Sequence, residues 1–232
     1  WRKGRLPYWI WLVQSVSCVF VQIRSSRRKT CAQELLEPTQ AKVIVTDRYP
    51  AYLWLDVRRH QICRAHLLRD WIAMSQRDGP LGAHGERLVE LERQLHRDWR
   101  AWKKGEMTRE QFLLDAIDLR MHIENACVQA TTYEHAPAVV RWVMEPKHAP
   151  RCWTFLSHED VELTNNQSER DVRGCVIQRK LSFGSKSVAG LRLMERLWTV
   201  GLTCQRQRRS LLEYVTQALL AHRAGDVPPI LI

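Results

Sequence analysis

A short apolar segment constrains the fold of this chain most strongly. The segment KVIVT, residues 42–46, places apolar, β-branched side chains side by side without polar alternation. Such a segment is typical of a buried strand in a parallel sheet. Upstream, YWIWLV (8–13) and CVFVQI (18–23) flank a short polar stretch, which predicts a β-hairpin. The other expected elements are a helix at 26–36, a strand at 59–63 and a helix at 65–74. Their order predicts an α/β core.

The pattern changes in the middle of the chain, where apolar residues recur at steps of three and four, as on amphipathic helices. The two series are Leu88, Leu91, Leu95, Trp99 and Trp102, and then Phe112, Ala116, Leu119, Ile123 and Ala126. Gly105 lies in the turn between them, and Thr108 is the expected N-cap of the second helix. We therefore expect a helical insertion at 81–145 between two parts of the core, 1–80 and 146–232.

The charge of the chain favours a polyanionic partner. The 36 Lys and Arg residues exceed the 25 Asp and Glu residues, for a net charge of +11, so nucleic acid is the leading candidate. The seven cysteines are odd in number and scattered, which indicates free thiols in a reducing cytoplasm rather than a disulfide scaffold. The apolar run at 8–23 is too short and too interrupted for a membrane span, so no membrane partner is expected.

Two acidic residues are candidate metal ligands. Asp47 follows the buried strand directly, at the end where open α/β sheets gather ligands, although an Asp that caps the next segment is the alternative. Glu169 lies three residues after Asn166, which is also the spacing of an ordinary capping box. Two carboxylates together with substrate phosphates could hold Mg²⁺. A two-metal site of this kind needs a third carboxylate.

Other motifs are weaker. Cys63 and His66 have the spacing of half a zinc site, and His148 with Cys152 might complete it, but a packed Cys and a hydrogen-bonded His are the default interpretation. Alternatively, His66 could lie near the phosphate. The Gly/Ser turn at 183–190 could offer backbone N–H groups to a phosphate, although it lacks the P-loop frame. The chain contains no GxSxG, HExxH or GxGxxG motif, so these enzyme classes have no support.

Three stretches taken together resemble a known family: VIVTDRYPAYLWL, RRHQICRAHLLRDW, and LTNNQSERDVR with the trailing FGSKSVAGLRLMERLWTVGLTCQRQRRSLLEYV. They are similar to the transposases of the insertion sequence 66 family, bacterial enzymes of the Asp-Asp-Glu class. The resemblance implies a ribonuclease-H-like mixed sheet flanked by helices, with an all-helical insertion before the catalytic Glu helix. It makes Asp47 and Glu169 the second and third catalytic residues, both ligands of Mg²⁺ or of Mn²⁺ as a substitute. It also matches a Cys-x-x-His to Cys63 and His66 without assigning these residues a role. We expect Cys63, His66 and Asn166 to lie around the metal or to face the phosphate.

Two departures from the family pattern matter. The family's first Asp lies in an Asp-Glu-Thr stretch just upstream of a Trp that corresponds to Trp1, so we expect this chain to be an N-terminally truncated fragment with impaired activity. We also expect site-specific DNA-binding elements upstream. Arg64 occupies a position where the family pattern leads us to expect an aromatic residue.

The expected function is that of a DNA transposase that hydrolyses phosphodiester bonds at transposon ends and joins the 3′-hydroxyls to target DNA. Residues 165–210 hold ten Lys or Arg against three Asp or Glu. The expected phosphate contacts are Arg170, Arg173, Lys186, Arg192, Arg206, Arg208 and Arg209, each with a solvated surface charge as the alternative. The alternative functions are a catalytically inactive, DNA-binding or self-associating remnant and a structure-specific nuclease. By family analogy we expect a homo-oligomer on double-stranded DNA in the bacterial nucleoid, with accessory proteins of the same element.

Overall fold

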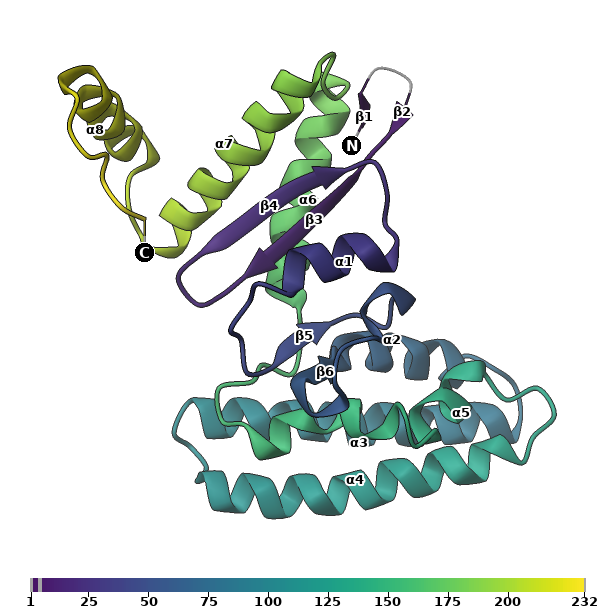
Figure 1. The fold of residues 1–232 in the computed structure, drawn as a ribbon. Helices are drawn as coiled ribbons and strands as arrows, with labels where there is room; N and C mark the ends of the chain where they lie inside the picture. The colour runs from purple at the N-terminus through teal and green to yellow at the C-terminus, as the bar shows by residue number, and fades with distance from the viewer. Residues whose placement is uncertain (1, 4–5, 232) are drawn as a thin grey trace. The chain divides into compact units, whose positions relative to one another are not determined.

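The computed structural model describes residues 2–3 and 6–231, which form two compact units. The terminal unit combines the residues up to Thr39 with those from Asn166 onward, and the central unit is Gln40–Asn165. Figure 1 labels the helices and strands of each unit. Within the described residues, no helix is both long enough and apolar enough to span a membrane.

The central unit begins with two predicted strands, of which the first was predicted to be parallel. Strand β5 (Ile44–Thr46) pairs in parallel with β6 (His60–Ile62), in the register Ile44 with His60 and Thr46 with Ile62. Both strands are three residues long, shorter than predicted. The connection between them contains two short 3₁₀ helices, η1 (Pro50–Tyr52) and η2 (Val57–Arg59). The carboxyl end of β5 therefore presents Asp47, as the sequence predicts.

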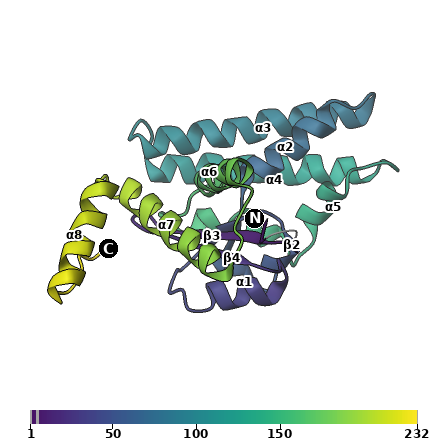
Figure 2. The same ribbon diagram turned by 90° about the horizontal axis from the view of Figure 1, so that it is seen from above.

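Helices make up most of the central unit. Its helices are α2 (Arg64–Ser75), α3 (Pro80–Lys103), α4 (Arg109–Thr131) and α5 (Ala138–Met144), followed by the 3₁₀ helices η3 (Ala149–Cys152) and η4 (Thr154–Ser157). Helices α3 and α4 run side by side as the predicted hairpin (Figures 1 and 2). Gly105 has a φ of 78° in the turn between them, and the Thr108 hydroxyl accepts the backbone N–H of Gln111 at 3.1 Å, which confirms the predicted cap.

One continuous core holds these helices together. Its members include fully buried residues of all three long helices, with Trp71 from α2, Leu88 and Leu95 from α3, and Phe112 and Ala116 from α4. The two predicted apolar series therefore face each other. Trp99 and Trp102 lie at the edge of this core, partly exposed.

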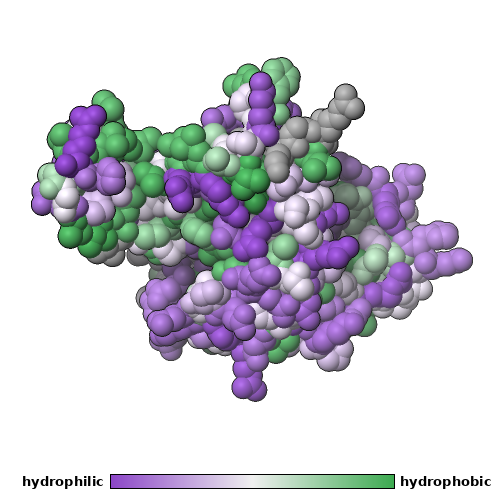
Figure 3. Space-filling view, turned by 45° about the horizontal axis from the view of Figure 1, so that its top comes forward, coloured by the Kyte–Doolittle hydropathy of each residue, from purple (hydrophilic) through white to green (hydrophobic). Residues whose placement is uncertain are grey.

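The terminal unit is built on an antiparallel hairpin. Strand β3 (Trp9–Gln14) pairs with β4 (Val19–Arg24), and α1 (Lys29–Leu36) follows, as predicted. Two short strands, β1 (Arg2–Lys3) and β2 (Leu6–Pro7), precede them. The last section is helical, with α6 (Asn166–Ser182), α7 (Val188–Arg206) and α8 (Leu211–Ala224). Helix α8 buries none of its residues, and Figure 3 shows apolar surface over α7 and α8.

Helix α7 covers the outer edge of strand β4 with polar side chains. Glu195, Thr199 and Thr203 follow one another at four-residue steps, so they share one face of the helix. Their side-chain oxygens accept alternate backbone N–H groups of β4, from Ile23 to Glu195 at 2.6 Å, from Val21 to Thr199 at 3.0 Å and from Val19 to Thr203 at 3.1 Å. Strand edges carry unpaired donors that natural proteins cover or protect. Here three helical side chains satisfy them.

The fold is thus mixed α/β and mostly helical, in agreement with the predicted class at that level. Among the described residues the strands form three separate two-stranded sheets, β1–β2, β3–β4 and β5–β6. Parallel and antiparallel pairing therefore both occur, but in different sheets. The expected division at residues 80 and 145 stays a prediction.

Candidate metal and DNA-binding site

Asp47 is positioned by the end of strand β5. Its side chain is half-buried, and its carboxylate Oδ1 accepts the backbone N–H of Tyr49 at 3.0 Å, the local turn that the alternative interpretation predicts. Tyr52 lies close by, and burial together with the Asp47 carboxylate raises the pKa of its hydroxyl, which therefore stays protonated. The hydrogen bond from Tyr49 orients the Asp47 carboxylate, whose two oxygens offer about four lone-pair sites in all.

A buried polar network supports the residue before Asp47. The Thr46 hydroxyl lies 2.7 Å from His60 Nε2, and Arg151 Nη1 lies 2.5 Å from His60 Nδ1. Because arginine can only donate, Nδ1 is the acceptor and we infer that Nε2 carries the proton. Burial, aided by Arg151 and His148, lowers the pKa of His60 to about 3. The imidazole is therefore neutral and links the end of β5 to η3.

Arg48 and Asp70 form an ion pair beside Asp47. The Arg48 guanidinium also lies over the ring of Trp142, with its Cζ 5.5 Å from the ring centroid. These contacts direct the Arg48 side chain toward α2 and α5. Asp47 and Arg48 thus take part in different interactions although they are adjacent in the sequence.

Cys63 forms hydrogen bonds both with the end of β5 and with Asn165, four residues before Glu169. Its backbone N–H donates to the Thr46 carbonyl at 2.8 Å, and its fully buried sulfur accepts the backbone N–H of Asn165 at 3.4 Å. The next residue, Arg64, donates its backbone N–H to the Leu163 carbonyl at 2.8 Å. Asn165, the last residue of the central unit, is therefore bonded to Cys63, and Cys63 is bonded to Thr46, the residue that precedes Asp47. This role agrees with the default interpretation of Cys63 as a packed thiol.

Glu169 lies in the first turn of α6 and is half-buried. The helix begins at Asn166, so Asn165 takes the position before it, and the predicted N-cap at Asn166 is wrong by one residue. The prediction failed because the sequence holds two consecutive asparagines, either of which suits a cap. Asp47 belongs to the central unit and Glu169 to the terminal unit.

The zinc alternative finds no support among the residues that the structure describes, because no group of three or more His, Cys, Asp or Glu side chains could hold a metal ion there. His148 instead stacks on Trp142 with the ring centroids 4.2 Å apart. Burial raises the pKa of the Cys152 thiol to about 11, so this side chain is a neutral core residue. His66 lies in the first turn of α2 and is half-buried.

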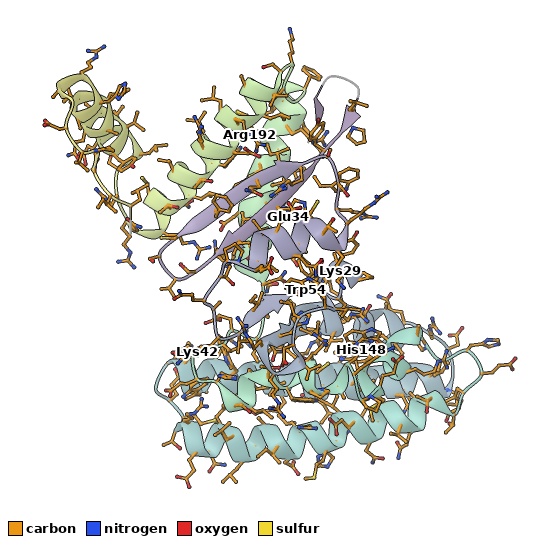
Figure 4. All side chains as sticks on the ribbon, viewed as in Figure 1. Lys29, Glu34, Lys42, Trp54, His148 and Arg192 are labelled. Carbon is orange, nitrogen blue, oxygen red and sulfur yellow. The ribbon has the colours of Figure 1, made fainter. Side chains whose placement is uncertain are left out.

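Of the seven predicted phosphate contacts, all but Arg206 are exposed. Arg170, Arg173, Lys186 and Arg208 are exposed, and Arg170 also donates to Gln167 at 2.6 Å. The others hold structural contacts: Arg192, on α7, binds Glu195 at 2.7 and 2.9 Å (Figure 4), Arg206 binds Asp171 at 2.8 Å, and Arg209 donates to the Ile230 carbonyl at 2.9 Å. The half-buried Arg206 also bonds to Gln14 of strand β3. Arg206 is therefore a structural contact between helices and strand β3, a role that neither the phosphate prediction nor the solvated-charge alternative anticipated.

The Gly/Ser turn at 183–190 starts helix α7. Phe183 and Gly184 have positive φ angles of 58° and 94°, and the Ser187 hydroxyl accepts the backbone N–H of Gly190 at 3.0 Å. Ser187 is thus the N-cap of α7. This local function accounts for the Ser and Gly residues of the turn.

The buried ion pair between Arg64 and Glu92 was not predicted from the sequence. Arg64 Nε and Nη2 bind the two carboxylate oxygens of Glu92 at 2.8 and 2.6 Å, with side chains only 1% and 0% exposed. The guanidinium also donates to the Cys152 carbonyl at 3.2 Å and lies over Trp153, 4.2 Å from the ring centroid. Burial opposes the charge of Arg64, but Glu92 outweighs it, so the pKa of Arg64 is raised. Two signals were available, an arginine where an aromatic residue was expected and a glutamate between Leu91 and Leu95 of an apolar series.

Comparison with known proteins defines the class to which this arrangement belongs. Residues 3–193 match the model of the transposase IS66 family. This range covers most of the chain and includes both predicted catalytic residues. The chain therefore belongs to the transposase IS66 family, and transposase family membership implies interaction with DNA. No curated protein and no solved structure matches the chain.

Proposed function

We propose that this chain belongs to the catalytic domain of a DNA transposase of the Asp-Asp-Glu class. In this proposal it hydrolyses phosphodiester bonds at transposon ends and joins the freed 3′-hydroxyls to target DNA. The observation that carries the proposal is the family match over residues 3–193, within which Asp47 follows a parallel strand and Glu169 opens a helix. A ribonuclease-H-like core is part of the proposal, supported by the order of strands and helices along the chain.

Asp47 and Glu169 are the proposed ligands of Mg²⁺, or of Mn²⁺ as a substitute. Carboxylate oxygens are the protein ligands that Mg²⁺ prefers. Bound metal would supply activation of the attacking oxygen and charge neutralisation at the phosphate. The backbone N–H of Tyr49 orients the Asp47 carboxylate, and Cys63 holds Asn165, four residues before Glu169, beside the carboxyl end of β5. The shared role of the two acidic residues rests on the family match, which includes both of them.

A metal-binding titration tests the two ligands directly. We expect Mn²⁺ to bind the chain, measured by calorimetry, and Asp47→Asn or Glu169→Gln each to weaken binding by at least about tenfold. Asp78→Asn and Glu34→Gln are matched controls, because they remove exposed carboxylates from the same two units. Unchanged binding in both site variants would contradict the assignment.

DNA assays distinguish the proposal from its alternatives. Transposase activity requires metal-dependent joining of a pre-cut transposon end to target DNA, and both Asp47→Asn and Glu169→Gln should abolish it. Cleavage without joining would instead favour a structure-specific nuclease. DNA binding without any metal-dependent reaction would favour an inactive remnant.

The proposed phosphate ligands are the six exposed residues among the seven predicted ones: Arg170, Arg173, Lys186, Arg192, Arg208 and Arg209. Removal of one phosphate-binding charge should make the slope of log Kd against log salt shallower by about one unit. We expect this change for Arg173→Gln and Arg170→Gln. Arg206→Gln should instead lower the melting temperature, since Arg206 binds Asp171. DNA affinity that hardly depends on salt would contradict the assignment. A homo-oligomer on DNA, accessory proteins of the element and a nucleoid location complete the proposal.

A further inference from the structure

The turn between helices α6 and α7 exposes two apolar side chains. It joins Ser182, the last residue of α6, to Val188, the first residue of α7 (Figure 1). Phe183 is 86% exposed, and Leu181, at the end of α6, is 77% exposed. Single apolar side chains are common on protein surfaces, so exposure alone assigns them no role. The backbone and the charges around Phe183 carry the argument further.

The backbone conformation of Phe183 is unfavourable for a phenylalanine. Its φ of 58° lies in the left-handed region, where a side chain with a Cβ costs free energy and where glycine or asparagine usually follows a helix. Because the ring is exposed, burial of the side chain does not compensate for this cost. Strained backbone of this kind clusters at sites that contact a ligand. The conformation of Phe183 therefore favours contact with a partner over a structural role.

The charges around the turn identify the kind of partner. Residues 172–194 contain five Lys or Arg and no Asp or Glu. Lys180 and Lys186 lie on the two sides of Phe183 in the sequence, and both are exposed. The last turn of a helix favours cations, which accounts for Lys180 in part, but Lys186 lies outside both helices. An apolar tip between cations is complementary to DNA, which carries phosphates along the edges of a groove and stacked bases inside it.

One face of α6 connects this turn with Glu169. At about 100° per residue, the exposed residues Arg170, Arg173 and Lys180 fall within an arc of about 80°. Glu169 lies about 20° outside that arc. At about 1.5 Å per residue, Phe183 lies about 20 Å from Glu169 along the helix axis, which corresponds to about six base pairs of DNA. A duplex that contacts the cations of this face would therefore reach the turn.

We propose that Phe183, assisted by Leu181, enters the base stack of double-stranded DNA as an apolar wedge, while Lys180 and Lys186 bind the phosphates beside it. Apolar wedges in the minor groove separate neighbouring base pairs and bend the duplex. The inference deepens the proposed function and rests on its DNA partner, but it needs no metal. It assigns a base contact about six base pairs from the phosphate nearest to Glu169.

Binding to two DNA duplexes tests the wedge. One duplex is fully paired, and the other carries a single central mismatch, where separating the bases costs less free energy. Measured by fluorescence anisotropy at one salt concentration and without metal, the chain should bind the mismatched duplex at least about fivefold more tightly.

Two variants assign this preference to the turn. Phe183→Asn should remove the preference and leave the melting temperature unchanged or higher, because asparagine tolerates a positive φ. Phe183→Leu should keep most of the preference, since leucine also serves as a wedge. Phe20→Thr is the matched control, because Phe20 is another exposed phenylalanine of the terminal unit (46%) and threonine suits its strand. This control should keep the full preference.

Several results would overturn the proposal. They are equal affinity of the unsubstituted chain for the two duplexes, a preference that survives Phe183→Asn, and tighter binding to single-stranded DNA than to the mismatched duplex. Self-association that Phe183→Asn abolishes without any effect on DNA binding would instead assign the turn to an interface between copies. Strand transfer without a mismatch preference would overturn the wedge alone. A preference lost in Phe183→Asn would support the wedge even if Asp47→Asn left metal binding unchanged.

Discussion

Breaking the buried ion pair between Arg64 and Glu92 should destabilise the central unit strongly. The pair is bidentate, with bonds of 2.6 and 2.8 Å between side chains that are 1% and 0% exposed. Removing one partner leaves the other as an uncompensated buried charge, which costs about 3–5 kcal/mol of unfolding free energy. We expect this loss for Arg64→Met and for Glu92→Met. Because the pair also carries a desolvation cost, the double variant should come within about 1–2 kcal/mol of the original chain.

Urea unfolding measures these free energies, and Trp71 and Trp153 of the same core provide the fluorescence signal. The double-mutant cycle should give a coupling energy of about 3 kcal/mol or more. The exposed pair of Arg97 with Glu90, 2.7 Å apart with side chains 47% and 62% exposed, is the control. Its cycle should give less than about 1 kcal/mol. A coupling for the buried pair no larger than that of the exposed pair would refute the reasoning.

Two further predictions concern the central unit. His60 is buried and its pKa is lowered from 6.5 to about 3, so the unfolded chain binds more protons between these pH values and stability falls as pH decreases through that window. The loss of unfolding free energy reaches up to about 5 kcal/mol. The unfolding free energy of His60→Gln, measured by urea unfolding, should therefore depend less steeply on pH. An equally steep dependence would contradict the prediction. Gly85→Ala should cost about 3 kcal/mol or more, because its Cβ would lie 2.3 Å from the backbone nitrogen of Ser75. Gly174→Ala is the control, since its Cβ would meet only a Trp198 ring at 3.6 Å. Equal melting temperatures for the two variants would contradict the prediction, because they would show that α2 and α3 can move apart at little cost in stability.

The site could be predicted from the sequence only in its local parts. The position of Asp47 after a parallel strand followed from five residues of apolar pattern, and Glu169 in the first turn of a helix followed from Asn and Glu spacing. The hydrogen bonds that link Thr46 to Cys63 and Cys63 to Asn165 could not be predicted, because Cys63 and Asn165 lie 102 positions apart in the sequence. Local signals act over one or two turns, whereas this contact depends on how the helices pack.

The sequence by itself determined where strands and helices form, because apolar periodicity and caps act between near neighbours. The hairpin of β3 and β4, the parallel pair and the long helices α3 and α4 all follow from it. The tertiary structure decided which polar groups are buried and with what partner. Arg64 and Arg206 look alike in sequence, yet one lies in the core with Glu92 and the other joins α7 to α6 through Asp171. A buried charge needs a counter-charge or hydrogen-bond acceptors, and these partners are set by packing rather than by sequence distance.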